Sequence, residues 1–144
     1  MTFGPVVHPV AKVEDLNESN KMLWKIASGE FQTPLPMSRV PAWIDVRNLA
    51  DAHVEALLRP DAGGKRYIPA APEGFSYSLA ASIILDEFAW AKGKVTEKEP
   101  QQHIDISYAL DGAKVTSELG VKYKSFKETV IDLVSQAKKL EDGL

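Results

Sequence analysis

The chain has 144 residues, of which 44% are hydrophobic and 26% charged, a composition typical of one globular domain over residues 1–144. Seventeen Lys and Arg against 20 Asp and Glu give a net charge of −3, so the chain lacks the basic excess that would favour nucleic acid as a partner. The absence of cysteine excludes disulfides, thiolate metal sites and a cysteine nucleophile.

The first half of the chain predicts two helices and short extended segments. The apolar residues 3–13 indicate an extended segment or the end of a strand. A helix follows, with Asn17 or Ser19 as its cap and Gly29 at its end. Three prolines in residues 31–41 predict a loop, and residues 42–46 have the pattern of a short buried strand.

A second helix is expected to begin at Asp45 or Asn48 and to run to about Leu58. Its apolar residues recur at a spacing of three and four, which predicts one buried face. That face comprises Leu49, Ala50, His53, Val54 and Leu57. We therefore interpret His53 as a core histidine hydrogen-bonded to the backbone rather than as a ligand.

The second half predicts a short strand over residues 65–69 and a helix over residues 76–91. A polar surface segment follows over residues 92–103, and then a short helix over residues 111–119 that ends at Gly120. Ser125 and Glu128 have the spacing of a capping box, which predicts the start of the last helix. These elements indicate an α+β fold, a small and mostly helical domain with a minor sheet.

The segment over residues 42–57, which begins Ala-Trp-Ile-Asp-Val-Arg-Asn, is similar to a signature of the extended short-chain dehydrogenases/reductases, within the NAD-dependent epimerase/dehydratase superfamily. It most resembles the fungal aldehyde and ketone reductases of the dihydroflavonol and methylglyoxal reductase group. Residues 3–5, 64–68 and 117–129 resemble further segments of that family. At position 48 the family usually has aspartate, whereas this chain has Asn48.

The resemblance covers the second half of the family, which implies a substrate-binding half and a truncated Rossmann-type reductase that lacks the N-terminal dinucleotide-binding half. None of the nine glycines forms a G-x-G-x-x-G turn, so we expect no bound cofactor. The family's catalytic serine, tyrosine and lysine lie upstream of the matching region. Tyr123 and Lys127 have the spacing of that pair, but the family has no active site there, so we predict that the spacing is accidental.

The candidate site residues are the polar groups that the resemblance places around a substrate cleft. We assign catalysis to His8, Arg39 and Arg47. We assign substrate binding to Phe3, Met22, Met37, Trp43 and Asp45. The alternative for Asp45 and Arg47 is a helix cap with a local ion pair, and the alternative for His8 is a solvated loop histidine. His103 and Asp105 alone supply too few ligands, so no metal is expected.

Three functional hypotheses follow. The first is a stand-alone pocket protein that binds a small apolar carbonyl or polyketide-like metabolite, with any catalysis non-redox, such as isomerisation, cyclisation or a proton shift. The alternative is a C-terminal fragment of an NADPH-dependent aldehyde or ketone reductase, inactive without its Rossmann half. A third is a non-catalytic subunit that completes a separate Rossmann partner.

No apolar run approaches the length of about 18 residues that a membrane helix needs, and the N-terminus lacks the layout of a signal peptide. We therefore expect a soluble cytoplasmic protein with a small-molecule substrate and neither a nucleic-acid nor a membrane partner. Because the expected strands lack the rest of a Rossmann sheet, exposed strand edges predict a homo-oligomer.

Overall fold

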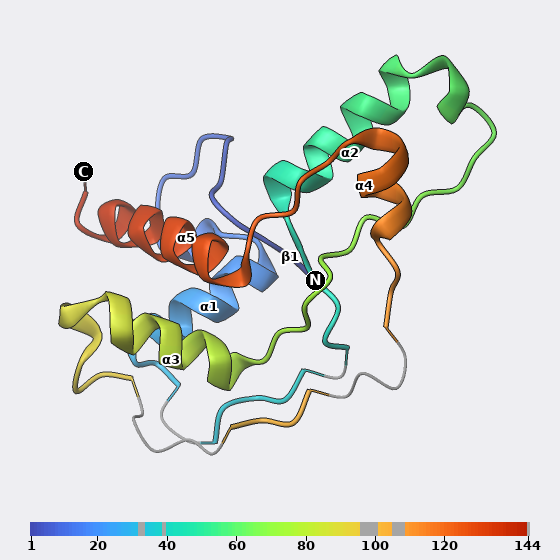
Figure 1. Cartoon of the computed structure of the whole chain (residues 1–144). Helices are drawn as coiled ribbons and strands as arrows, with labels where there is room; N and C mark the ends of the chain where they lie inside the picture. Colours follow the sequence, from blue (N-terminus) through green and yellow to red (C-terminus); the bar gives the residue numbers. More distant parts are fainter. Residues whose placement is uncertain (32–33, 39, 96–100, 105–108, 144) are drawn as a thin grey trace.

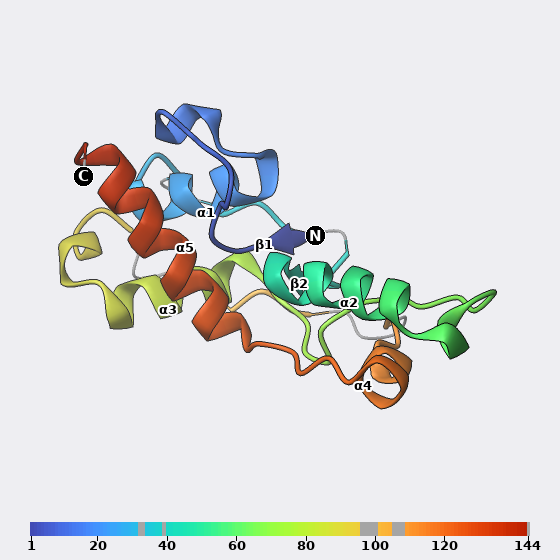
Figure 2. The same cartoon turned by 90° about the horizontal axis from the view of Figure 1, so that it is seen from above.

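A computed structural model describes residues 1–31, 34–38, 40–95, 101–104 and 109–143 of the chain. Its helices dominate, and they surround one short parallel strand pair (Figures 1 and 2). The strands are β1 (Thr2–Phe3) and β2 (Ile44–Asp45). The α-helices are α1 (Glu18–Ser28), α2 (Val46–Leu58), α3 (Tyr77–Glu87), α4 (Ala113–Leu119) and α5 (Phe126–Glu141). Short 3₁₀ turns cover Val13–Asp15, Pro60–Ala62 and Ala89–Ala91.

The strand pair joins the beginning of the chain to its middle. Thr2 pairs with Ile44 and Phe3 with Asp45, and α1 lies on the connection between the two strands. Because parallel strands require such a crossover, the first 45 residues form a β–α–β unit. The opening segment is the end of a strand, one of its two predicted forms, since β1 ends at Phe3, and the predicted strand within residues 42–46 is confirmed at Ile44–Asp45.

The helices separate into two groups on either side of the strands (Figures 1 and 2). On one side α1, α3 and α5 pack together around a large apolar core. On the other side α2 and α4 enclose a smaller cluster built on Ala52, Val115 and Leu119. Phe3 lies at the centre of the large core, where its ring centre is 5.0 Å from that of Phe75 in an edge-to-face arrangement.

Side-chain caps fix where several helices begin. Asp45 accepts a hydrogen bond from the backbone N–H of Arg47, and Ser76 accepts one from Leu79. Ser125 and Glu128 form the predicted capping box at the start of α5. Asp45, rather than Asn48, is therefore the cap of α2, and the five predicted helix starts agree with the structure within about two residues.

Two of the expected elements differ from the structure. Residues 65–69 form no strand, because no described strand pairs with them and the side chains of Lys65 and Tyr67 bond instead to Glu118. The helix expected over residues 76–91 ends at Glu87, and a 3₁₀ turn replaces its last part.

The buried face of α2 also differs from the prediction. The helix buries Asn48 and Ala52, whereas Val54 and Leu57 are 52% and 85% exposed. His53 donates a 2.7 Å hydrogen bond from Nδ1 to the carbonyl oxygen of Leu49, as expected, but its side chain lies on the exposed face and not in the core. The reason is that α2 contacts α4 through the small Ala52, and no described segment covers its opposite side.

Side-chain amides of Asn and Gln hydrogen-bond to the backbone of several loops, whose backbone groups neighbouring strands would pair with in a larger sheet. Asn20 of α1 donates a 2.8 Å hydrogen bond to the carbonyl of Gly4 and accepts one of 3.2 Å from the N–H of the same residue. We call this arrangement, in which one side-chain amide both accepts from and donates to the backbone, an amide clamp. Gln136 of α5 makes a second amide clamp on both backbone groups of Val6, at 2.6 and 2.8 Å. Asn48 makes a third, between Lys122 and Lys124.

Asn20→Asp tests an amide clamp directly. A carboxylate at this buried position can accept from Gly4 but cannot donate to its carbonyl, so we expect the free energy of unfolding to fall by about 1–3 kcal/mol. Asn17→Asp is the control, because Asn17 is exposed and both side chains suit its position before α1. Urea denaturation that gives equal midpoints for the two variants would contradict this role of Asn20.

Gly112 lies against the backbone of a distant loop. A Cβ atom added at Gly112 would lie 2.0 Å from the carbonyl oxygen of Ala70, so Gly112→Ala must displace backbone. We expect a loss of about 1–3 kcal/mol in the free energy of unfolding, the usual cost of overpacking. At Gly63 the nearest atom would lie 3.6 Å from an added Cβ, so Gly63→Ala should keep a free energy of unfolding within about 0.5 kcal/mol of the wild type. Thermal denaturation of both variants and the wild type measures the difference.

Candidate functional site

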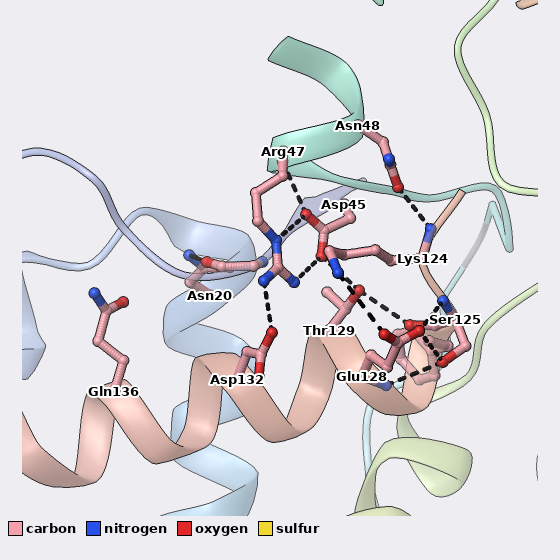
Figure 3. Close-up of polar contacts among 12 residues, drawn as sticks. Asn20, Asp45, Arg47, Asn48, Lys124, Ser125, Glu128, Thr129, Asp132 and Gln136 are labelled. Carbon is pink, nitrogen blue, oxygen red and sulfur yellow. Dashed lines mark hydrogen bonds and ion pairs between the residues drawn. The ribbon is translucent and has the colours of Figure 1, made fainter. Parts of the chain in front are cut away.

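The carboxylate of Asp45 lies at the junction of β2, α2 and α5 and is 1% exposed (Figure 3). One oxygen accepts from the backbone N–H and the Nε of Arg47, at 2.8 and 2.9 Å. The other accepts from Arg47 Nη2 and from the hydroxyl of Thr129, both at 2.7 Å. Four donors therefore satisfy a buried charge, as burial of a carboxylate requires.

Arg47 links this carboxylate to a second one. Its Nη1 lies 2.6 Å from Asp132 on α5, so the guanidinium bridges α2 to α5 (Figure 3). The hydrogen bond to Asp45 raises the pKa of Arg47, and the hydrogen bond to Asp132 raises it further. Partial burial of the guanidinium would lower this pKa, but the two carboxylates outweigh it. Burial alone would raise the pKa of Asp45, but the hydrogen bonds from Arg47 and Thr129 outweigh it and hold that pKa below its ordinary value.

This geometry shows the helix cap and the ion pair that the sequence allows for Asp45 and Arg47. Asp45 is ionised, fully hydrogen-bonded and closed to solvent, an arrangement suited to fixing Arg47 and not to taking up a proton. Arg47 is 31% exposed, and its named bonds use three of its five N–H groups, so it can still donate to a ligand. Its catalytic role stays a prediction.

The other residues assigned to a substrate cleft lie in different surroundings. Phe3 and Trp43 are 1% exposed and belong to the aromatic core, where Trp43 donates from Nε1 to the carbonyl of Glu73. Met22 is half-buried against the same core, whereas the side chain of Met37 is 71% exposed. Arg39 lies outside the described residues.

The structure distributes these residues over separate cavities. His8 lines one cavity beside α5, Met37 lines a second beside His103, and Trp43 lines a third beside Met1 and Leu110. Neither Asp45 nor Arg47 lines any of the three. The residues expected to line one substrate cleft thus do not meet in any of these three cavities, because Phe3 and Trp43 pack into the core. The binding roles of these residues stay predictions.

Several polar residues of this region were not identified from the sequence. Thr129, Asp132 and Gln136 follow one another on α5 at spacings of three and four and point toward β2 and the opening segment (Figure 3). Their spacing places these three polar side chains on one face of the last helix, and this was the signal in the sequence that could have identified them. Tyr123 donates to the carbonyl of Gly112, and Lys127 pairs with Glu87, so their contacts agree with an accidental spacing.

No group of acidic, histidine or cysteine side chains among the described residues could hold a metal ion. Across the same part of the chain, no helix combines the length and apolar character needed to cross a membrane.

No family model matches the chain. It is 30% identical over 142 residues to the NADPH-dependent methylglyoxal reductase GRE2 of Saccharomyces cerevisiae, an alignment that covers 96% of this chain and 41% of that protein. It is 26% identical over 136 residues to the ketoreductase azaE of Aspergillus niger, covering 94% and 40%. A crystal structure of yeast methylglyoxal/isovaleraldehyde reductase Gre2 complexed with NADPH superposes with a TM-score of 0.78 at 28% identity, covering 99% of this chain and 42% of that one.

The chain is homologous to part of these fungal reductases. It spans about two fifths of the length of the relatives it matches, and its mostly helical fold with a minor sheet is that of a partial reductase domain. The predicted resemblance to fungal reductases is confirmed along the chain. Residues 42–57, on which the resemblance was first based, supply β2, the Asp45 cap and most of α2.

The pKa of Asp45 predicts a dependence of stability on pH. Because the native pKa is lower than the ordinary value of 3.8, the unfolded chain binds the proton first as the pH falls. The contribution of Asp45 is therefore present above about pH 4 and is lost as the pH falls through the native pKa. Asp45→Asn should cost about 2 kcal/mol at pH 7 and should flatten the acid limb of the free energy of unfolding.

Urea denaturation between pH 2.5 and pH 7 measures this effect. Asp61→Asn, which removes an exposed carboxylate, serves as the control and should keep the wild-type slope. Parallel acid limbs for the wild type and Asp45→Asn would exclude Asp45 as the source of the dependence.

Proposed function

We propose that this chain forms the substrate-side part of an NADPH-dependent reductase of small carbonyl compounds, and that reduction needs a dinucleotide-binding part in addition to these 144 residues. The observation that carries the proposal is the match to an NADPH-complexed reductase over nearly the whole of this chain and 42% of the other. The missing glycine-rich turn supports it, because pyrophosphate binding in this fold class needs that turn.

The sequence alone favours a stand-alone pocket protein with non-redox catalysis, but the named relatives are reductases and lend that hypothesis no support. Hydride transfer requires a nicotinamide held in register with the substrate. The structure offers a rigid base for this, since the Asp45–Arg47 pair fixes the strand-to-helix turn that follows β2. On this proposal Arg47 and the residues around it face the assembled cleft.

Self-association and a cytoplasmic location stay predictions. The apolar side chains of Val7 and Leu57 are 87% and 85% exposed, which supports a partner surface. The strand within residues 42–46 offers no such surface, since Ile44 is 5% exposed and buried within the chain.

A complementation experiment tests the proposal. We would join the part of yeast GRE2 that precedes its matched region to this chain and measure NADPH oxidation with methylglyoxal. The joined protein should turn over, whereas this chain alone and the GRE2 part alone should not. Titration calorimetry of the chain alone should give no saturable heat at millimolar NADPH.

The controls separate assembly from catalysis. Arg47→Lys in the joined protein keeps the charge but loses the two-sided contact with Asp45, so it should lower turnover at least tenfold if Arg47 positions the cleft. A micromolar dissociation constant for NADPH with this chain alone, or turnover of a carbonyl substrate without NADPH, would overturn the proposal.

A further inference from the structure

A cavity of about 240 Å³ lies between the opening segment and the last two turns of α5. Apolar side chains form most of its wall: Val6, Val10, Leu16, Ala137 and Leu140. Its polar residues are His8, Gln136 and Lys139. The cavity is therefore amphipathic: most of its lining is apolar, and the nitrogen atoms of three side chains can donate hydrogen bonds into it.

The amide clamp of Gln136 fixes the shape of this cavity. Gln136 accepts from the N–H of Val6 and donates one of its two amide N–H groups to the carbonyl of Val6, so it holds the opening segment against α5 and keeps one N–H for a ligand. The wall on the α5 side is rigid as well, because Ala137 is 1% exposed and packs into the large core. A ligand would meet a preformed site and pay little to order it.

Besides that amide N–H, His8 and Lys139 are the polar groups of the cavity that can contact a ligand. Both are exposed, and neither makes a hydrogen bond or ion pair with any residue that the structure describes. No carboxylate lines the cavity. Glu141 at the end of α5 and Asp142 directly after it both pair with Lys138, which offsets one of their two negative charges beside the site.

We propose that this cavity binds a small carboxylate with a short apolar tail. Lys139 and His8 hold the carboxylate, and Val10, Leu16 and Leu140 surround the tail. The volume is below the range of about 300–1,000 Å³ that drug-sized ligands occupy, which selects a tail of roughly six carbons or fewer. The inference does not depend on the reductase proposal, because the site uses neither Arg47 nor any nucleotide.

Titration of the labelled chain with hexanoate, followed by ¹H–¹⁵N spectra at constant ionic strength, tests the proposal. We expect saturable shifts at the amides of Val6, His8, Ala137 and Leu140. Hexanol has the same tail without the charge, so it should bind at least tenfold more weakly. Equal binding of the two compounds, or no saturable shift below about 10 mM hexanoate, would overturn the carboxylate site.

Variants locate the binding. Lys139→Ala and His8→Ala should each raise the dissociation constant of hexanoate about tenfold, since each removes a donor to a charged group. Lys92→Ala removes an exposed lysine elsewhere and should leave it unchanged. Val10→Trp should fill the cavity and abolish binding while leaving the unfolding midpoint near that of the wild type. Equal effects of Lys139→Ala and Lys92→Ala would show non-specific attraction and refute the site.

Discussion

The buried carboxylate of Asp45 is the contact on which the arrangement of the chain depends. It ends β2, begins α2 and accepts from Thr129 on α5, so three elements meet at two oxygen atoms. A buried charge is tolerated only when its partners are in place, and this requirement fixes α2 and α5 relative to the strand pair. Gly4, directly after β1, lies close to this carboxylate: its φ is 129°, and a Cβ there would lie 3.4 Å from both oxygens of Asp45 and 3.0 Å from Val46.

Amide clamps explain how a domain with such short strands keeps long loops in place. A pair of two-residue strands satisfies few backbone groups, and buried backbone groups need partners. Asn20, Gln136 and Asn48 supply both a donor and an acceptor to the segments they contact. Gln102 does the same between α3 and the loop over residues 34–38, where it accepts from the N–H of Tyr77 and donates to the carbonyl of Pro36. These contacts are directional, which gives each loop one position.

The parts of the fold that depend on neighbouring residues were predictable from the sequence. Helix starts at Ser76 and Ser125 follow from capping chemistry, and the local pair of Asp45 and Arg47 follows from their place at a strand end. Contacts between distant residues were not predictable in the same way. Asp132 meets Arg47 across 85 positions, and no local pattern encodes that distance.

The candidate cleft shows the same limit. The apolar stripe of α2 has the spacing of a buried face, yet the helix contacts α4 through Ala52, so Val54 and Leu57 remain at the surface. Phe3 and Trp43 are large apolar side chains of the kind that line pockets. The same property places them in the core, where Phe3 packs against Phe75 and Trp43 against Phe126. Hydrophobicity predicts that a side chain leaves water, and only the three-dimensional contacts decide where it goes.

The clamp between Gln136 and Val6 has a consequence for how the polypeptide is made. Its two residues are 130 positions apart, so at about 5–20 residues per second a ribosome needs roughly 6 to 26 seconds between them. During that interval the first segment has neither its clamp nor Phe126, the aromatic partner of Phe3 on α5. The opening segment is thus synthesised long before the helix that fixes it, and a nascent chain interrupted before α5 exposes this segment to chaperones and proteases.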